Sequence, residues 1–335
     1  MTKRYLRDPI FIMSSERSGS NLLRVLLGNH SHIAAPRALQ LLATFRNSIP
    51  RYGPLDRKEN MRMLFEDCLS LANHPYHAWN VSFDFETFYA VYAPYDFLSL
   101  FNSMYREYAH CTRRQRFVCK EINVFEFAEQ LAGYYDTPRF LYLHRDPRDY
   151  AASWKKFSFG PATTYGAARR WADEQRSCIA VRERLGMNVL TLSYEQLILN
   201  TEQVMRDVLT FVEEPYESSC CALQPGENKD VAWNPMWKNL NQPIDRKNYN
   251  TYHRTLSRSA IEMIETVAQE PMKGLGYTFD TKAEWKAGNL FFLQESILSR
   301  IAQFRKRYVP EKGLRLLCER KRLVQTILHN RNRGC

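Results

Sequence analysis

Short apolar runs alternate along the chain with longer segments in which apolar residues recur at helical spacing. The runs at 10–13, 117–119, 140–144 and 188–195 predict strands, and the first reads as a buried one because all four of its residues are apolar. Helical segments lie between these runs. Strands joined through helices indicate a parallel sheet. We therefore expect an α/β fold of three layers, with helices on both faces of the sheet.

The polar loop after the first strand is the most informative stretch of the chain. It contains Gly19 and leads directly into a helical segment, so unpaired backbone N–H groups at the helix start converge on one spot. Arg17, Ser18, Ser20 and Asn21 add side-chain donors there. The chain has neither the G-x-x-x-x-G-K-[ST] nor the G-x-G-x-x-G pattern. The loop therefore predicts a phosphate cradle that differs from the common nucleotide-binding loops.

A second candidate site follows the strand at 140–144. Arg145 comes directly after it, Pro147 fits the first turn of a helix, and Ser153 lies eight residues beyond Arg145. Arginine offers a planar fork of donors, and a serine hydroxyl can complete a clamp around a phosphate. In parallel sheets, ligands bind beyond the carboxyl ends of the strands, where both loops lie.

These motifs resemble those of sulfotransferases, which use 3′-phosphoadenosine 5′-phosphosulfate (PAPS). The loop Arg-Ser-Gly-Ser-Asn-Leu, the strand–Arg-x-Pro–helix unit and a strand ending in Tyr194-Glu195 occur in the order that this family has. The resemblance covers roughly residues 8–281. It implies that PAPS contacts Arg17, Ser18, Gly19, Ser20, Asn21 and Leu22 at the 5′-phosphosulfate, Arg145, Ser153, Arg246 and Lys247 at the 3′-phosphate, and Tyr194 at the adenine.

Catalysis of sulfuryl transfer should rest on positioning and on cations that stabilise the departing phosphate. The resemblance implies this role for Arg17, and Lys120 at the end of a predicted strand is a second candidate cation. The family also has a general base, but its two known positions correspond here to Ala38 and Ile122. Two other residues are candidate bases, Glu121 first and His32 second.

The resemblance thus predicts an enzyme that moves a sulfuryl group from PAPS to a hydroxyl or nitrogen of a small-molecule acceptor, without a metal. Two explanations for the missing base remain open besides a substitute residue. A nitrogen acceptor needs little help from a base, or the protein binds the nucleotide without turning it over. A nucleotide kinase is a third reading. It would need a Mg²⁺ ligand near the phosphates, where Asp146 and Asp149 are the candidates, and the chain has no Walker-type lysine.

Residues 40–115, between the two phosphate loops, are rich in aromatic side chains. This composition predicts a helical segment with an aromatic core. Some of its rings are candidates for the wall of the acceptor pocket, since such pockets are mostly apolar.

Eight cysteines are scattered without a C-x-x-C pair, which argues against zinc. No apolar stretch has the length of a membrane span or the form of a signal peptide, so we expect reduced thiols and a cytoplasmic location. No nucleic-acid-binding motif is evident.

The net charge of +11 is concentrated in residues 282–335, which hold thirteen Lys and Arg against four Asp and Glu. Apolar residues recur there at helical spacing, which predicts a basic amphipathic helical extension. We expect these helices to pack on the main domain and leave their charges in water. A homodimer contact, an acidic partner or a membrane surface are the alternatives.

Overall fold

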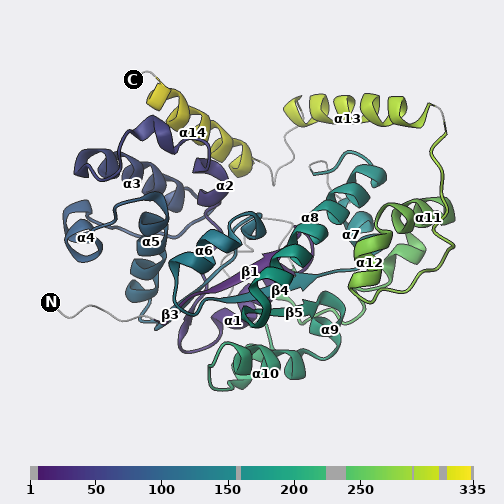
Figure 1. Ribbon diagram of the computed structural model, residues 1–335, viewed down its shortest axis with the longest axis horizontal. Helices are drawn as coiled ribbons and strands as arrows, with labels where there is room; N and C mark the ends of the chain where they lie inside the picture. The colour runs from purple at the N-terminus through teal and green to yellow at the C-terminus, as the bar shows by residue number, and fades with distance from the viewer. Residues whose placement is uncertain (1–6, 156–159, 224–238, 289, 309–314, 333–335) are drawn as a thin grey trace.

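The computed structural model describes residues 7–155, 160–223, 239–288, 290–308 and 315–332. One sheet of five parallel strands lies at its centre, in the order β2-β3-β1-β4-β5 (Figure 1). The strands are β1 (Ile10–Ser14), β2 (Ile33–Ala34), β3 (Arg116–Cys119), β4 (Arg139–His144) and β5 (Val189–Ser193). The predicted strands and their parallel arrangement are confirmed, except that Tyr194 and Glu195, expected at the end of a strand, begin a helix.

Helices connect the strands and cover both faces of the sheet (Figure 1). The α-helices are α1 (Ser20–Gly28), α2 (Leu41–Phe45), α3 (Lys58–Asn73), α4 (Phe85–Tyr92), α5 (Phe97–Cys111), α6 (Ala128–Tyr134), α7 (Pro147–Trp154), α8 (Thr164–Leu185), α9 (Tyr194–Leu199), α10 (Thr201–Phe211), α11 (Arg258–Val267), α12 (Gln269–Gly274), α13 (Phe291–Tyr308) and α14 (Arg315–Asn332). Short 3₁₀ helices are η1 (Ile49–Tyr52), η2 (Val124–Glu126), η3 (Gly186–Asn188), η4 (Ser218–Cys221) and η7 (Thr251–Arg254).

The central strand β1 is apolar from Ile10 to Met13, and these four residues are buried between the two faces of the sheet. Ile10 and Ile12 pack toward α1 and α10, whereas Phe11 and Met13 face a larger aromatic core. That second core joins the sheet to the helices α2–α6, most of which come from the aromatic-rich segment at 40–115. The three-layer α/β fold follows directly.

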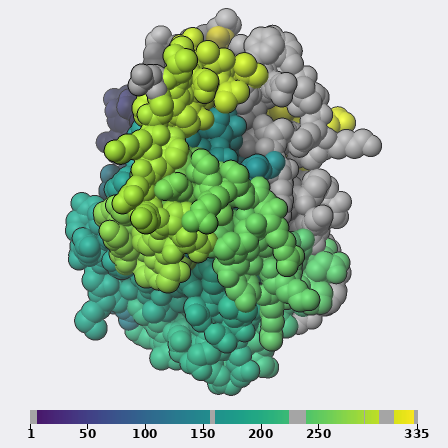
Figure 2. Space-filling view, turned by 90° about the vertical axis from the view of Figure 1, so that its right-hand side faces the viewer, coloured from purple at the N-terminus to yellow at the C-terminus, as the bar shows by residue number. Residues whose placement is uncertain are grey.

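The two ends of the basic extension behave differently. Helix α14 packs against α3 and η1, with Ile327 buried and the Arg331 guanidinium 2.8 Å from the Asp67 carboxylate. Helix α13 lies at the top of Figure 1, and Figure 2 shows the chain from α11 to α13 on one face of the molecule. Around α13, the apolar side chains of Leu290, Phe292, Leu293, Ile297, Leu298 and Ile301 are exposed.

Within the described ranges, no helix is both long enough and apolar enough to cross a membrane. The seven cysteines in the described part of the chain are free thiols.

Candidate functional site

The phosphate loop turns sharply between β1 and α1. Arg17 adopts a left-handed conformation (φ 67°), and Gly19 caps α1 with φ 89°. A Cβ atom on Gly19 would lie 2.4 Å from Cδ2 of Tyr194, closer than such atoms approach one another. Glycine is therefore required twice over, by its backbone angle and by the ring beside it. The loop thus leads into the N-terminus of α1, where backbone N–H groups attract anions.

Arg145 joins the second strand–helix unit to this loop. Its two terminal nitrogens donate to the backbone carbonyls of Arg17 (3.1 Å) and Asn248 (3.2 Å). Its guanidinium carbon also lies 4.4 Å from the ring centroid of Tyr194, whose hydroxyl accepts from the Asn248 amide at 2.7 Å. Residues from three distant segments are thereby fixed around one cationic group.

Arg17 contacts Ser153, the residue that the sequence motif places with Arg145 in the second candidate site. Its Nε donates to the Ser153 hydroxyl at 3.3 Å. Burial, and then the neighbouring Arg145 charge, lowers the pKa of Arg17 to about 10. The guanidinium is still charged at neutral pH, so two cations lie together where an anion would offset their repulsion.

A cavity of about 480 Å³ opens at the carboxyl ends of the strands. It brings together eight of the predicted site residues: Arg17, Gly19, Ser20, Asn21, Leu22, Lys120, Arg145 and Tyr194. Ser18 is a buried residue of the loop and does not line the cavity. Ser153 does not line it either, but its hydroxyl accepts a hydrogen bond from Arg17, which does. Arg246 and Lys247 are exposed and do not line it; their neighbours Asp245 and Asn248 do.

The remaining charges of the second motif have structural partners. Asp146 caps α7 and binds the guanidinium of Arg148, which also lies 2.7 Å from Glu265. Asp149 accepts hydrogen bonds from Thr251 Oγ1 and Tyr252 N. These contacts fix α7 against the segment that carries Asn248. Neither Asp146 nor Asp149, the two carboxylates that a kinase would need for Mg²⁺, is among the described residues that line the cavity.

Lys120 and Glu121, adjacent at the end of β3, point to different places. Lys120 lines the cavity, and burial lowers the pKa of its ammonium group, while Glu16 opposes that effect. Glu121 is buried, and its Oε1 accepts from the backbone N–H groups of Leu39 and Gln40 and from the Tyr105 hydroxyl, at 2.8 to 2.9 Å. Burial raises the pKa of Glu121, and these hydrogen bonds counteract the rise. Glu121 therefore holds the 37–40 loop and does not line the cavity.

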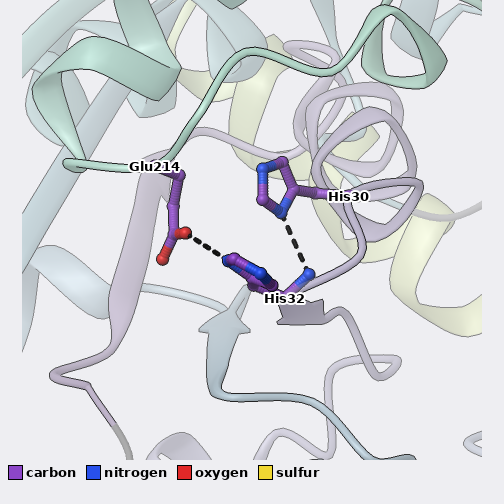
Figure 3. A group of neighbouring side chains, drawn as sticks. All are labelled: His30, His32 and Glu214. Carbon is purple, nitrogen blue, oxygen red and sulfur yellow. Dashed lines mark hydrogen bonds and ion pairs between the residues drawn. The ribbon is translucent and has the colours of Figure 1, made fainter.

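His32 lies at the opposite edge of the sheet. Its carbonyl accepts from the backbone N–H groups of Gln115 and Arg116, at the amino ends of β2 and β3. Its ring Nδ1 lies 2.9 Å from the Glu214 carboxylate (Figure 3). The structure thus separates His32 from the cavity at the carboxyl ends.

His30, His32 and Glu214 also form one of two groups, within the described residues, whose spacing could suit a metal ion. Figure 3 shows the backbone nitrogen of His32 facing the His30 ring, where Nδ1 accepts its hydrogen at 3.0 Å. The other ring nitrogen must then carry a proton, and it donates to the Pro215 carbonyl at 2.9 Å. Glu214 also pairs with Arg116. Hydrogen bonds occupy both nitrogens of His30, so this cluster is explained as a structural anchor.

The order of the strands divides the cavity into two halves. The half that the family resemblance assigns to the nucleotide, called the nucleotide half, surrounds Arg17, Arg145 and Tyr194 at the ends of β1, β4 and β5. The half that this assignment leaves for the acceptor, called the acceptor half, lies beyond β2 and β3, on the other side of β1. It consists of Arg37, Ala38, Gln40, Tyr76, Lys120 and Ile122, together with Leu317 and Lys321 from α14.

Several lining residues have no motif that would identify them in the sequence. Glu16 precedes Arg17, and its carboxylate lies 2.7 Å from Arg170 of α8. Arg37, Tyr76 and Lys321 come from a loop, an inter-helix segment and the extension. The sequence points to Asn248 only through its position directly after Arg246 and Lys247.

A parallel sheet that brings a glycine turn, a helix N-terminus and two arginines to one cavity defines an α/β protein with a cationic cavity at the carboxyl ends of its strands. The profile of the sulfotransferase family matches residues 9–218, and the chain belongs to this family. This confirms the family assignment made from the motifs.

Solved structures agree on the fold. The sulfotransferase domain from the curacin biosynthetic pathway is 18% identical, with a TM-score of 0.55 over 82% of this chain and 99% of that one. The sulfotransferase domain of the Synechococcus PCC 7002 olefin synthase is also 18% identical, with a TM-score of 0.56 over 83% of this chain and 98% of that one. No curated protein matched the sequence.

Proposed function

We propose that the protein transfers a sulfuryl group from PAPS to a hydroxyl or nitrogen of a small-molecule acceptor. The observation that carries this proposal is the convergence of Arg17, Arg145 and Tyr194 on the Gly19 turn, in a member of the sulfotransferase family. A flat ring beside two guanidinium groups and a helix N-terminus suits an adenine nucleotide with phosphates at both ends.

In this proposal each residue has a defined task. The N-terminus of α1 and the side chains of Ser20 and Asn21 bind the 5′-phosphosulfate, and Tyr194 contacts the adenine. Arg145 binds the 3′-phosphate, with Arg246 and Lys247 as predicted further contacts. Ser153 orients Arg17 through the hydrogen bond to its Nε.

The reaction breaks the bond between sulfur and the 5′-phosphate oxygen and forms one from sulfur to the acceptor atom. Arg17 and Lys120 stabilise the negative charge left on the phosphate, and both line the cavity. The acceptor's proton must leave during this step. Ala38 and Ile122, the two positions that correspond to the family's bases, line the acceptor half without a titratable group. A nitrogen acceptor, whose attack needs less help from a base, is consistent with that wall.

Calorimetric titration with 3′-phosphoadenosine 5′-phosphate (PAP) tests the nucleotide site. Wild type should bind, and Arg145→Ala should bind about 10- to 100-fold more weakly, since it loses a charged hydrogen-bonding group. Arg206→Ala, an exposed charge on α10 paired with Glu202, is the matched control and should bind as wild type does. A folded wild-type protein that does not bind PAP contradicts the proposal.

Transfer is tested separately, with radiolabelled PAPS and mixtures of alcohol, phenol and amine acceptors. Incorporation of label into any acceptor supports the enzyme. Tight PAP binding without transfer to any of them favours the non-catalytic alternative.

A further inference from the structure

Helix α14 of the basic extension forms part of the cavity wall, although it lies outside the residues that match the family profile. Leu317 and Lys321 both line the cavity and are four residues apart, so they occupy the same face of the helix. Arg322, the next residue along, is exposed and does not line the cavity.

The buried side chain of Arg320 fixes α14 in this position. Its Nε lies 2.7 Å from Nε2 of His77, and NH2 donates to the Leu39 carbonyl (3.2 Å) and the Thr44 hydroxyl (3.0 Å). Burial, followed by the Arg320 charge, lowers the pKa of His77 to about 3, so the ring is neutral and accepts the hydrogen bond. The 37–40 loop that carries Arg37 is thus attached directly to α14.

The opposite side of that loop is equally constrained. The Glu121 carboxylate accepts from Leu39 N and Gln40 N, and the Trp79 indole donates to the Arg37 carbonyl at 2.8 Å. Together with Arg320, these contacts hold the 37–40 loop from both sides and so fix the position of Arg37 in the wall.

The charge of this wall is entirely positive among the described lining residues. Beyond β2 and β3 and from α14 it presents Arg37, Lys120 and Lys321, and no carboxylate. Glu16 and Asp245, the acidic residues of the described lining, come from the phosphate loop and the 245–248 segment. Glu16 is paired with Arg170, and its charge also acts on Lys120 and Tyr76 of this wall. Lys120 is assigned to the departing phosphate, and the other two cations of this wall are Arg37 and Lys321.

We infer that the acceptor carries an anionic group, a carboxylate, phosphate or sulfate ester, that binds Lys321 of α14 and Arg37 while the reacting atom faces Lys120. This inference rests on the proposed function, because it assigns the nucleotide to the other half of the cavity. Leu317, Ala38 and Ile122 provide the apolar contacts between the two ends of such an acceptor.

The test uses the full chain saturated with PAP, so that added anions cannot occupy the nucleotide half. Calorimetry compares probes in pairs that differ in one anionic group: benzyl alcohol with 4-(hydroxymethyl)benzoate, and glucose with glucose 6-phosphate. The anionic member should bind at least tenfold more tightly. Lys321→Ala should reduce that preference about tenfold, whereas Arg322→Ala should leave it unchanged.

The inference is overturned if the anionic and the neutral probe of each pair bind with equal affinity, or if neither binds. So does a Lys321→Ala protein that behaves like Arg322→Ala. PAP binding is measured first for every variant and should stay within twofold of wild type. Failure of wild type to bind PAP would instead contradict the proposed function, so the two failures are distinguishable. A thermal melt confirms that each variant is folded.

Discussion

The two halves of the cavity are built in different ways. In the nucleotide half, Arg17, Arg145 and Tyr194 follow the ends of β1, β4 and β5. Each of these strands therefore contributes one residue to the site. The acceptor half combines a loop after β2, a residue between α3 and α4, the end of β3 and the helix α14. Short contiguous motifs form the nucleotide half, whereas the acceptor half forms only when segments distant in the sequence pack together. Mutations should therefore separate nucleotide binding from acceptor binding.

The largest separation should come from Gly19→Ala. The added Cβ would meet the Tyr194 ring at 2.4 Å, on a residue with φ of 89°. We expect PAP affinity to fall 100-fold or more, corresponding to about 3 kcal/mol. Gly133→Ala is the matched control, because a Cβ there has nothing within 4 Å, and it should leave PAP binding unchanged. Retention of wild-type affinity by Gly19→Ala would show that the turn tolerates a side chain.

Glu121→Gln should damage the acceptor half alone. The amide can still accept through its oxygen but loses the charge that attracts Leu39 N, Gln40 N and the Tyr105 hydroxyl. We expect a loss of about 1–2 kcal/mol in the free energy of unfolding, measured by urea denaturation, with PAP affinity unchanged.

The same variant distinguishes a positioning role from catalysis by Glu121. A residue that only holds the 37–40 loop leaves the shape of the pH–rate profile intact when it is replaced. Disappearance of an acidic limb from that profile would instead identify Glu121 as the base.

A pH effect should arise in the sheet next to the nucleotide half. Burial lowers the pKa of His144 to about 4, against 6.5 for an ordinary histidine. The unfolded chain then binds more protons than the folded one, so this contribution to stability is lost as the pH falls below 6.5 and levels off below 4. Between pH 7 and 5.5 the loss is about 1 kcal/mol.

His144→Gln should remove that part of the pH dependence. Melting midpoints measured at pH 7 and 5.5 should differ less in this variant than in wild type. Equal differences in the two proteins would count against a buried neutral His144. Glu121 and Glu195, whose pKa values burial raises, act in the opposite direction in both proteins and cancel in the comparison.

The smallest effect is expected at the far end of α14. The Arg331 guanidinium pairs with Asp67 at 2.8 Å and is partly exposed, so Arg331→Ala should cost about 0.5–1 kcal/mol of stability. Acceptor affinity should weaken slightly and PAP affinity should not change. A larger effect on PAP than on the acceptor would contradict the division of the cavity into two halves.

This division also explains what the sequence could predict. The parallel sheet, the phosphate loop and Arg145 follow from local patterns, because a strand, a turn and a helix start are contiguous in the chain. Arg37 and Lys321 share no local pattern, since they line one cavity only when α14 packs against α3 and η1. Position beside Lys120 made Glu121 a candidate base, yet adjacent residues at a strand end point in different directions, and Glu121 turns toward the loop at 37–40.

The place of α14 in the chain has a consequence for biosynthesis. Chains are made from the N-terminus at about 5–20 residues per second, and early segments fold while later ones are still being synthesised. Every described residue of the nucleotide half lies before α14, so a nascent protein can form the phosphate loop and its clamp before Leu317 and Lys321 are synthesised. Under the proposed function, nucleotide binding would then be acquired on the ribosome before acceptor selectivity. Premature termination ahead of α14 would yield a protein whose cavity lacks the wall residues Leu317 and Lys321.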